Sequence, residues 1–208
     1  MKKQLLLILL LLSGFVYSQK QIHVSDKAAQ RISEHKVIAI LPFDVNITYK
    51  KQPKNFSAEA NRDQEIAMST NIQTSMYTFL LRRKNEYFVD FQDVDKTNIL
   101  LKKHGVYDKL DTLTKDEIAQ ILGVDGVISG KFEIHNSKSD GAAMTSMILW
   151  GYSGKTGTGT LTMNIHDGKD GELLWRFFKT MKDYLGKSTD NLVEGMMRKV
   201  SRNFPYYK

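Results

Sequence analysis

Apolar residues recur along the chain with two different periods, which divides it into expected strands and helices. Residues 36–43, KVIAILPF, form a nearly continuous apolar run closed by a proline, as in a strand buried on both faces. Residues 158–166 instead alternate between apolar and polar, the pattern of a strand with one buried face. The turn-forming stretch 167–171 follows them, so residues 173–181 are expected to complete a β-hairpin. Two further strands are expected over 87–91 and 127–134.

Helical periodicity separates these strands. Residues 58–84 place the apolar positions 68, 72, 76, 79 and 80 on one face, which predicts an amphipathic helix. Thr114 and Glu117 have the spacing of a capping box, and Gly123 fits the position after the end of that short helix, where φ is positive. Two more helices are expected, one capped by Asp93 or Asp95 and ended by Gly105, the other capped by Ser188 or Thr189 and ended by Pro205.

The resulting element order, β-α-β-α-α-β-β-β-α, predicts an α/β (α+β) fold. Early strands separated by helices should pair parallel and the late hairpin antiparallel, so we expect a mixed sheet of about five strands with helices packed on it. Without internal repeats or a second boundary, residues 36–208 should form one domain with loop insertions at 44–57 and 135–157. Residues 19–35 are polar and weakly patterned, which suggests a leader segment or a short helix.

Residues 1–18 have the pattern of a secretory signal peptide. Lys2 and Lys3 precede the apolar run 5–12, which is shorter than the roughly 20 residues that span a bilayer. The residues before Gln19 suit a signal-peptidase site, so cleavage is expected near Ser18-Gln19, with an uncleaved membrane anchor as the alternative. The expected location of the mature chain is therefore the periplasm or the outside of the cell.

The amino-acid composition excludes several kinds of active site and limits the expected partners. The absence of cysteine excludes disulfides, a thiol nucleophile and cysteine-ligated zinc, and it removes the residue to which a bacterial lipoprotein attaches its lipid. The net charge of +7 is spread over small basic clusters such as Lys50-Lys51, which favours an anionic envelope surface as a partner. Cations at helix ends also account for such clusters. Nucleic acid is not an expected partner of an exported chain with scattered charge.

No motif predicts a cofactor or a metal. Gly154-Lys155-Thr156 lacks the glycine that a phosphate loop places five positions earlier, and the Asp167–Gly171 turn lacks the ligand register of a calcium loop. The five histidines show no metal-ligand spacing. His135 and His166 lie at the ends of two expected strands, so they could approach each other if those strands pair. An exported hydrolase that uses these two histidines and a carboxylate is therefore an alternative to a non-enzymatic protein.

An isolated apolar island at 144–150 is the most unusual feature of the second insertion. Its apolar residues are consecutive rather than periodic, so exposed it would be a contact patch, and folded over the sheet edge it would be a lid. The expected interaction surface consists of this island and the first basic cluster: Met144, Met147, Ile148, Leu149, Trp150, Lys50 and Lys51.

Three short motifs carry a resemblance to a known family. Pro42-Phe43 closes the first strand, Leu122-Gly123-Val124-Asp125 leads into a central strand, and Asp170-Gly171 precedes an aromatic strand containing Trp175. Over about residues 36–206 the chain resembles the envelope α/β domain of CsgG, the TolB N-terminal domain and LpoB. The resemblance implies a non-enzymatic envelope module that contacts or assembles other proteins. It implies no shared catalytic residue, and it makes Asp125 the corner of a turn.

These observations together predict an exported, periplasmic cell-envelope protein that acts as a protein-interaction module or as an assembly or secretion accessory. Its expected partners are other envelope proteins. The main alternative is a homo-oligomeric outer-membrane secretion component of the CsgG type.

Overall fold

The computed structural model describes residues 20–52, 54, 56–136, 157–181 and 189–208. The expected signal peptide and the apolar island at 144–150 lie outside these residues.

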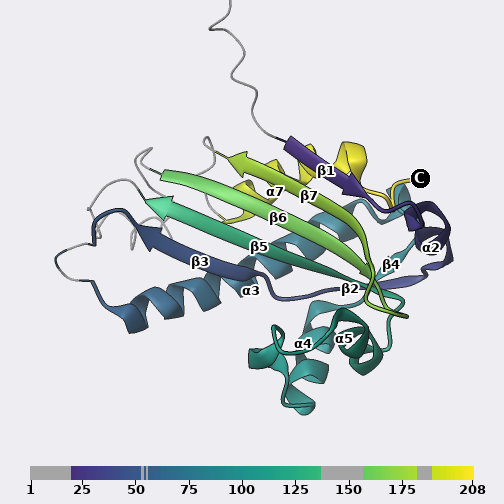
Figure 1. Ribbon diagram of the computed structural model, residues 1–208, viewed down its shortest axis with the longest axis horizontal. Coiled ribbons are helices and arrows are strands. Elements are labelled where there is room, and N and C mark those ends of the chain that lie inside the picture. The colour runs from purple at the N-terminus through teal and green to yellow at the C-terminus, as the bar shows by residue number, and fades with distance from the viewer. Residues whose placement is uncertain (1–19, 53, 55, 137–156, 182–188) are drawn as a thin grey trace, which may run out of the picture.

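The strands form one mixed seven-stranded sheet in the order β1-β7-β6-β5-β2-β4, and β3 pairs with β5 beyond the end of β2 (Figure 1). β2, β3, β4 and β5 pair in parallel, whereas β5, β6, β7 and β1 pair antiparallel. This confirms the predicted mixed α/β sheet with early parallel strands and a late hairpin. The strands are β1 Lys20–Val24, β2 Val37–Ile40, β3 Asp44–Tyr49, β4 Asp90–Phe91, β5 Gly126–Asn136, β6 Gly157–Asp167 and β7 Leu173–Met181.

Two strands were not predicted. The segment 44–49 was expected to belong to an exposed loop, and this was wrong, because Val45 and Ile47 are buried while the polar residues between them face solvent. β1 lies within the segment 19–35, where a leader or short helix was expected, and it pairs with β7 at the outer edge of the sheet. The expected strand at 87–91 is reduced to two residues, preceded by an isolated bridge between Tyr87 and Tyr207.

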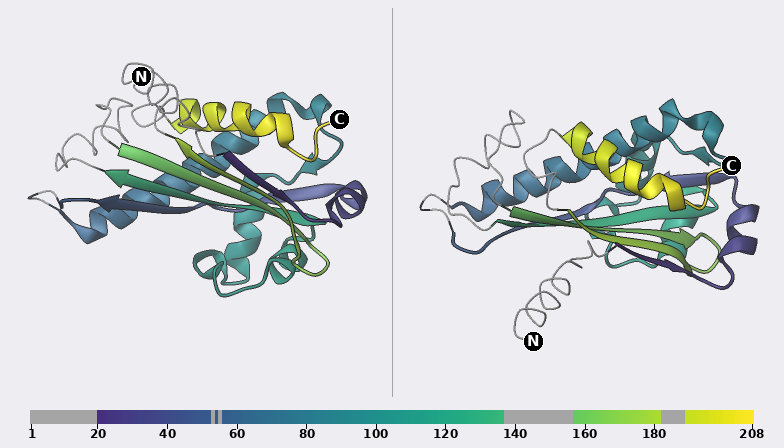
Figure 2. Two further views of the ribbon diagram at one scale, coloured as in Figure 1. Left: turned by 45° about the horizontal axis from the view of Figure 1, so that its top comes forward. Right: turned by 90° about the horizontal axis from the view of Figure 1, so that it is seen from above.

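Helices cover the two faces of the sheet unequally. α3 and α7 lie side by side along one face, whereas α4 and α5 pack together on the other face near one end (Figure 2). Three predicted helix ends are present: Asp93 caps α4, the Thr114–Glu117 capping box opens α5, and Gly123 ends it at φ 63°. The helices are α2 Ala28–Glu34, α3 Ala58–Arg82, α4 Val94–Lys103, α5 Lys115–Leu122 and α7 Thr189–Val200, with short 3₁₀ turns η1 Lys84–Glu86, η2 Tyr107–Lys109 and η3 Ser201–Asn203.

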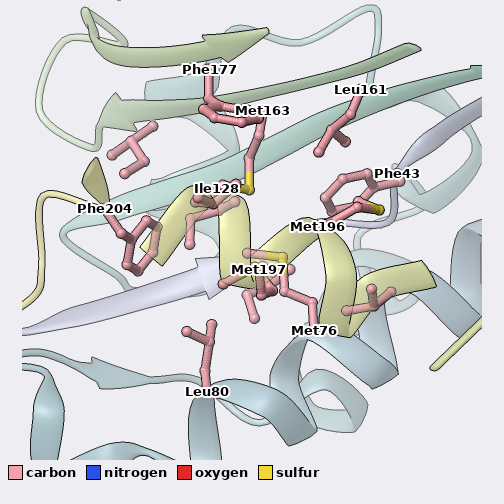
Figure 3. Packing of buried hydrophobic residues seen from close by; sticks show 14 of the residues in the cluster. Phe43, Met76, Leu80, Ile128, Leu161, Met163, Phe177, Met196, Met197 and Phe204 are labelled. Carbon is pink, nitrogen blue, oxygen red and sulfur yellow. The ribbon is translucent and has the colours of Figure 1, made fainter. Parts of the chain in front are cut away.

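The main core lies between the sheet and the α3–α7 layer. Figure 3 shows Met76 and Leu80 of α3 and Met196 and Met197 of α7 directed towards the strand side chains. The predicted alternation in β6 is confirmed, since its apolar residues are all buried on this side. A smaller core on the opposite face joins α4 and α5 to β2 and β5: Ala39, Leu41, Leu101, Ile118, Ala119, Leu122 and Val127.

β2 and β3 act as one interrupted strand along β5. Ile40 of β2 pairs with Ile128, but Asp44 of β3 pairs with Lys131, so the β2–β3 side takes four steps where β5 takes three. The extra residue shifts the register by one, as in a β-bulge. Phe43 closes this interruption by packing on the backbone at Gly130, where an added Cβ would lie 2.1 Å from a ring carbon of Phe43.

We expect Gly130→Ala to destabilise the fold by about 1–3 kcal/mol, because the buried Phe43 ring must move to admit the methyl group. Urea unfolding of both proteins would measure the difference. The double variant Gly130→Ala/Phe43→Leu should lose less free energy of unfolding than the sum of the losses in the two single variants. Strictly additive free energies would contradict the proposed contact.

Candidate interaction surface

The described part of the expected interaction surface lies just beyond β3. Lys50 and Lys51 are both exposed in the bend that follows Tyr49. Tyr49 pairs with Asn136, the last residue of β5, and Asn136 pairs with Gly157, the first residue of β6. The two lysines therefore leave the sheet at the same end as the connection that contains Met144, Met147, Ile148, Leu149 and Trp150, which lies outside the described residues.

A groove of about 370 Å³ lies beside β3. One wall is the β2–β3 junction and the start of β3, the second is the first half of α3, and the third is the segment around η2. Figure 1 shows β3 at the free edge of the sheet, with α3 passing along one face. The lining residues are Pro42, Phe43, Asp44, Val45, Arg62, Glu65, Ile66, Ser69, Thr70, Tyr107, Asp108, Leu110 and Asp111.

Side chains of α3 cover most of the outer edge of β3. The backbone N–H of Ile47 donates to Glu65 Oε1 at 2.9 Å, its carbonyl accepts from Asn61 Nδ2 at 3.3 Å, and the Phe43 carbonyl accepts from the Ser69 hydroxyl. Alternate residues of a strand direct their backbone groups to the same edge, so Val45 also faces outwards. No described residue bonds to these Val45 groups, which lie in the groove wall.

The groove is acidic although the chain is basic. Four carboxylates line it, those of Asp44, Glu65, Asp108 and Asp111, against the single guanidinium of Arg62. Arg62 Nη1 lies 3.5 Å from Glu65 Oε2, and Asp44 lies 3.9 Å from Lys131 Nζ. Asp108 and Asp111 are exposed and lie within 4 Å of no cation among the described residues, although the charge of Asp111 acts on the nearby Lys115, whose pKa is lowered mainly by burial. The groove therefore combines exposed carboxylates with an edge of β3 that is nearly enclosed, since Val45 is only 3% exposed.

A second cluster of charged side chains is internally paired, and its central members Asp167 and His35 are buried. Arg31 donates to Asp167 Oδ2 at 3.0 Å and to Asp170 Oδ2 at 2.9 Å, which joins α2 to the β6–β7 turn. His35 Nδ1 lies 2.8 Å from the Tyr206 hydroxyl, and its other ring nitrogen lies 4.0 Å from Asp167. Burial lowers the pKa of His35, although the charge of Asp167 opposes this, and burial raises the pKa of Tyr206. A neutral, enclosed histidine of this kind stabilises the packing of α2 against the C-terminal segment that contains Tyr206.

Asp125 is the corner residue that the sequence predicted. Its Oδ2 accepts the backbone N–H groups of Lys36 and Val37, both at 2.8 Å. Burial raises the pKa of Asp125, but the hydrogen bonds from Val37 and Lys36 outweigh it and leave the pKa below its usual value. Asp44, a carboxylate that follows the first expected strand and could do acid-base chemistry if it met Asp125, pairs with Lys131, five residues along β5 from the Gly126 that follows Asp125. The two carboxylates lie roughly 20 Å apart along the sheet and cannot share a site.

The histidines of the hydrolase alternative lie at opposite ends of the sheet. His135 pairs with Thr158, whereas His166 pairs with Val127. The antiparallel register thus separates them by eight residues of β6, or roughly 27 Å. The prediction that these two side chains approach each other was wrong, and a hydrolytic site built from both is excluded.

Within the described ranges, no group of three or more histidine, aspartate or glutamate side chains is placed to hold a metal ion. No helix among these residues is long and apolar enough to cross a membrane.

No protein-family model matches the chain, and no curated protein sequence matches it. The fold is similar to three solved structures. The lipoprotein GNA1162 from Neisseria meningitidis aligns at 13% identity over 80% of this chain and 96% of its own, with a TM-score of 0.49. The dodecameric PelC from Paraburkholderia phytofirmans aligns at 10% identity over 91% and 98%, with a TM-score of 0.36. The LpoB C-terminal domain from Salmonella enterica aligns at 11% identity over 75% and 93%, with a TM-score of 0.35.

The groove was not predicted, although two signals for it are present in the sequence. The segment DVNITY at 44–49 alternates polar and apolar residues, which indicates a strand. Ile66 lies off the buried stripe of α3 and is 49% exposed, so it is an apolar residue without a core role. Neither signal reveals that η2 folds against the same edge.

Removal of the buried Asp167 carboxylate, which pairs with Arg31, should destabilise the fold. We expect Asp167→Ala to lower the free energy of unfolding by about 2–3 kcal/mol, because the partly buried Arg31 loses its enclosed partner. Asp170→Ala is the matched control, since Asp170 also accepts from Arg31 but is 45% exposed, against 1% for Asp167. Chemical denaturation of both variants measures the difference. Equal losses would show that burial of the pair is irrelevant.

Stability should fall as the pH drops from about 6.5 towards 4. Burial, assisted by the charge of Lys115, lowers the pKa of His166 to about 4, so the folded protein keeps this ring neutral. The unfolded chain takes up the proton near pH 6.5, and folding is disfavoured below that value. After allowance for partial solvent exposure, the loss at pH 5 is on the order of 1 kcal/mol.

The test compares His166→Asn with His135→Asn, which alters an exposed strand-end histidine. Unfolding measured at pH 7.5 and 5 should show a smaller pH effect in His166→Asn than in the wild type or in His135→Asn. An unchanged difference between the two pH values in His166→Asn would refute this assignment.

Proposed function

We propose that this chain is an exported cell-envelope protein that acts without catalysis, as a protein-interaction or assembly module. The observation that carries the proposal is the contrast between its two charged clusters. The buried Asp167 and His35, and the exposed Asp125, are engaged in contacts within the fold. The groove beside β3 instead carries the exposed carboxylates of Asp44, Asp108 and Asp111, as a surface that binds another molecule does.

The proposed location rests on the first residues of the chain. Their charged start, short apolar run and tolerated cleavage residues favour export, followed by release near Ser18-Gln19. The lack of cysteine argues against lipid attachment at the new N-terminus. The mature chain would therefore work in the periplasm or outside the cell, where an envelope protein is the expected partner.

The proposed contact region has two parts at the β3 side of the sheet. One is the groove. The other is Lys50 and Lys51 together with the connection that leaves β5 at Asn136, opposite Tyr49. A partner that spans this edge would meet acidic side chains in the groove and basic ones beyond the end of β3, so charge would fix its orientation.

Site-specific photo-crosslinking tests the proposal. A photoreactive amino acid would replace Ile66 at the groove or Ile99 on α4, two positions with nearly equal exposure of 49% and 51%. In cells that naturally make the protein, the position 66 variant should give a discrete covalent adduct with another envelope protein after illumination. The position 99 variant should not give that adduct.

Mass spectrometry of the adduct would identify the partner, and size-exclusion chromatography of the mature chain would separate a monomer from a ring. Absence of any adduct at position 66, at Lys50 and at Lys51 would overturn the proposal.

A further inference from the structure

β1 forms an outer edge of the sheet, on the side opposite to β3 (Figure 1). The Ser25 N–H donates to the Leu174 carbonyl at 2.9 Å, so His23, two residues earlier, also directs its backbone groups to β7. The N–H and C=O groups of Ile22 and Val24 therefore point away from the sheet. Within the part of the chain that the structure describes, no residue bonds to them.

This edge is exposed and lacks the features that protect a free strand. Val24 is 55% exposed, and the side chains of Gln21 and His23 are exposed as well. β1 pairs with β7 in one register along its whole length, without a bulge. Residues 21–24 contain no proline and no lysine, with which natural proteins blunt such edges. An open edge of this kind is a template for a further strand.

The N-terminal chain is too short to cover β1 itself. With the expected cleavage near Ser18-Gln19, one residue remains ahead of β1, and the chain continues from β1 directly into the turn before α2. The N-terminal segment therefore does not return over the edge, and a strand of another molecule can reach it.

A second copy of the chain offers the matching strand. On the opposite side of its sheet, α3 side chains cover the edge of β3, and Val45 there is only 3% exposed. β4, at the remaining edge, has two residues. β1 is therefore the longest open edge that the described part of a copy presents. Two identical edges meet antiparallel about a two-fold axis, which closes the assembly as a dimer.

The side chains of β1 favour one register. Centred on His23, the pairing opposes Ile22 of each copy to Val24 of the other, an apolar match on both sides of the axis. A pairing centred on Ile22 would instead oppose Val24 to the charged Lys20. Ile22 already packs against the main core, and Val24 follows it on the same face of the sheet, so the first register extends this core across the axis.

We propose that two copies of this chain pair through the free edges of β1, antiparallel and centred on His23, into a two-fold dimer with one continuous sheet. The inference goes beyond the proposed function, because it uses the opposite side of the sheet. It leaves the groove and the lysines beyond β3 accessible at the two outer ends of the dimer.

Sedimentation equilibrium of the mature chain, purified after export, tests the pairing. The wild type should show a monomer–dimer equilibrium. Val24→Lys replaces an apolar match by a charge on both sides of the axis and should raise the dissociation constant roughly tenfold. Ile99→Lys on α4 is the matched control, because Ile99 is 51% exposed, and it should leave the constant unchanged. A wild type that stays monomeric up to about 1 mM, or equal weakening by both variants, would overturn the inference.

Single cysteines map the register, because the natural chain contains none. In the proposed pairing, position 23 faces its own copy across the axis at a Cα–Cα distance of about 4.5 Å, which a disulfide spans. His23→Cys should therefore give a covalent dimer on mild oxidation. Gln21→Cys, on the same exposed face but roughly 14 Å from its copy, should stay monomeric under the same denaturing conditions. Equal crosslinking of both variants would contradict the proposed register and overturn the inference.

Three further outcomes separate this inference from its alternatives. Assemblies larger than a dimer that disappear in Val24→Lys would show an open or ring-shaped contact and overturn the two-fold pairing. A photo-crosslink from position 24 to a different envelope protein, together with a monomeric purified chain, would assign the edge to a foreign strand. If position 66 captures an envelope protein while the purified chain is monomeric, the proposed function stands and this inference falls.

Discussion

The register between β2 and β3 is the constraint on which the β3 side of the molecule depends. One extra residue between Ile40 and Asp44 reverses which backbone groups face outwards. In β2 the outward carbonyl of Ile38 accepts from Gln92 beside β4, whereas in β3 the outward groups belong to Phe43, Val45 and Ile47. A single edge thus pairs with a strand at one end and with helix side chains at the other.

The close contact between Phe43 and Gly130 holds this register in place. A side chain at position 130 would occupy the position of the Phe43 ring, so the ring and the glycine fit only when β3 is offset as observed. Phe43 belongs to the same core as α3 and α7, whose packing fixes the depth of the ring (Figure 3). The part of the groove wall that Phe43 forms is therefore an indirect product of core packing.

The two charged clusters illustrate how burial decides what a side chain does. Arg31, Asp167, His35 and Tyr206 join α2, the hairpin turn and the C-terminal segment, and their partners leave little capacity for outside contacts. Asp108 and Asp111 are of the same chemical type but lie on an exposed turn, so solvent stabilises their charge. An unpaired strand edge next to such charges is hazardous for aggregation, and the α3 side chains over Ile47 shorten it.

The sequence by itself determined the local elements and the fold class. Several local features are set by residues within a few positions of one another, and all of them are present in the structure. They are the buried stripe of α3, the capping box at Thr114, the turn at Gly123 and the alternation of β6. The corner role of Asp125, which the family resemblance implied, is also present, since its carboxylate accepts the backbone N–H of Lys36.

Features that depend on pairing between distant segments were decided only by the tertiary structure. β1 and β3 became strands because β7 and β5 accept them, although their own patterns are short. The antiparallel register of β5 and β6, not the nature of the residues, placed His135 and His166 at opposite ends. The groove needs β3, α3 and η2 together, and periodicity cannot reveal such a meeting, because it records which face of an element is buried but not which neighbour buries it.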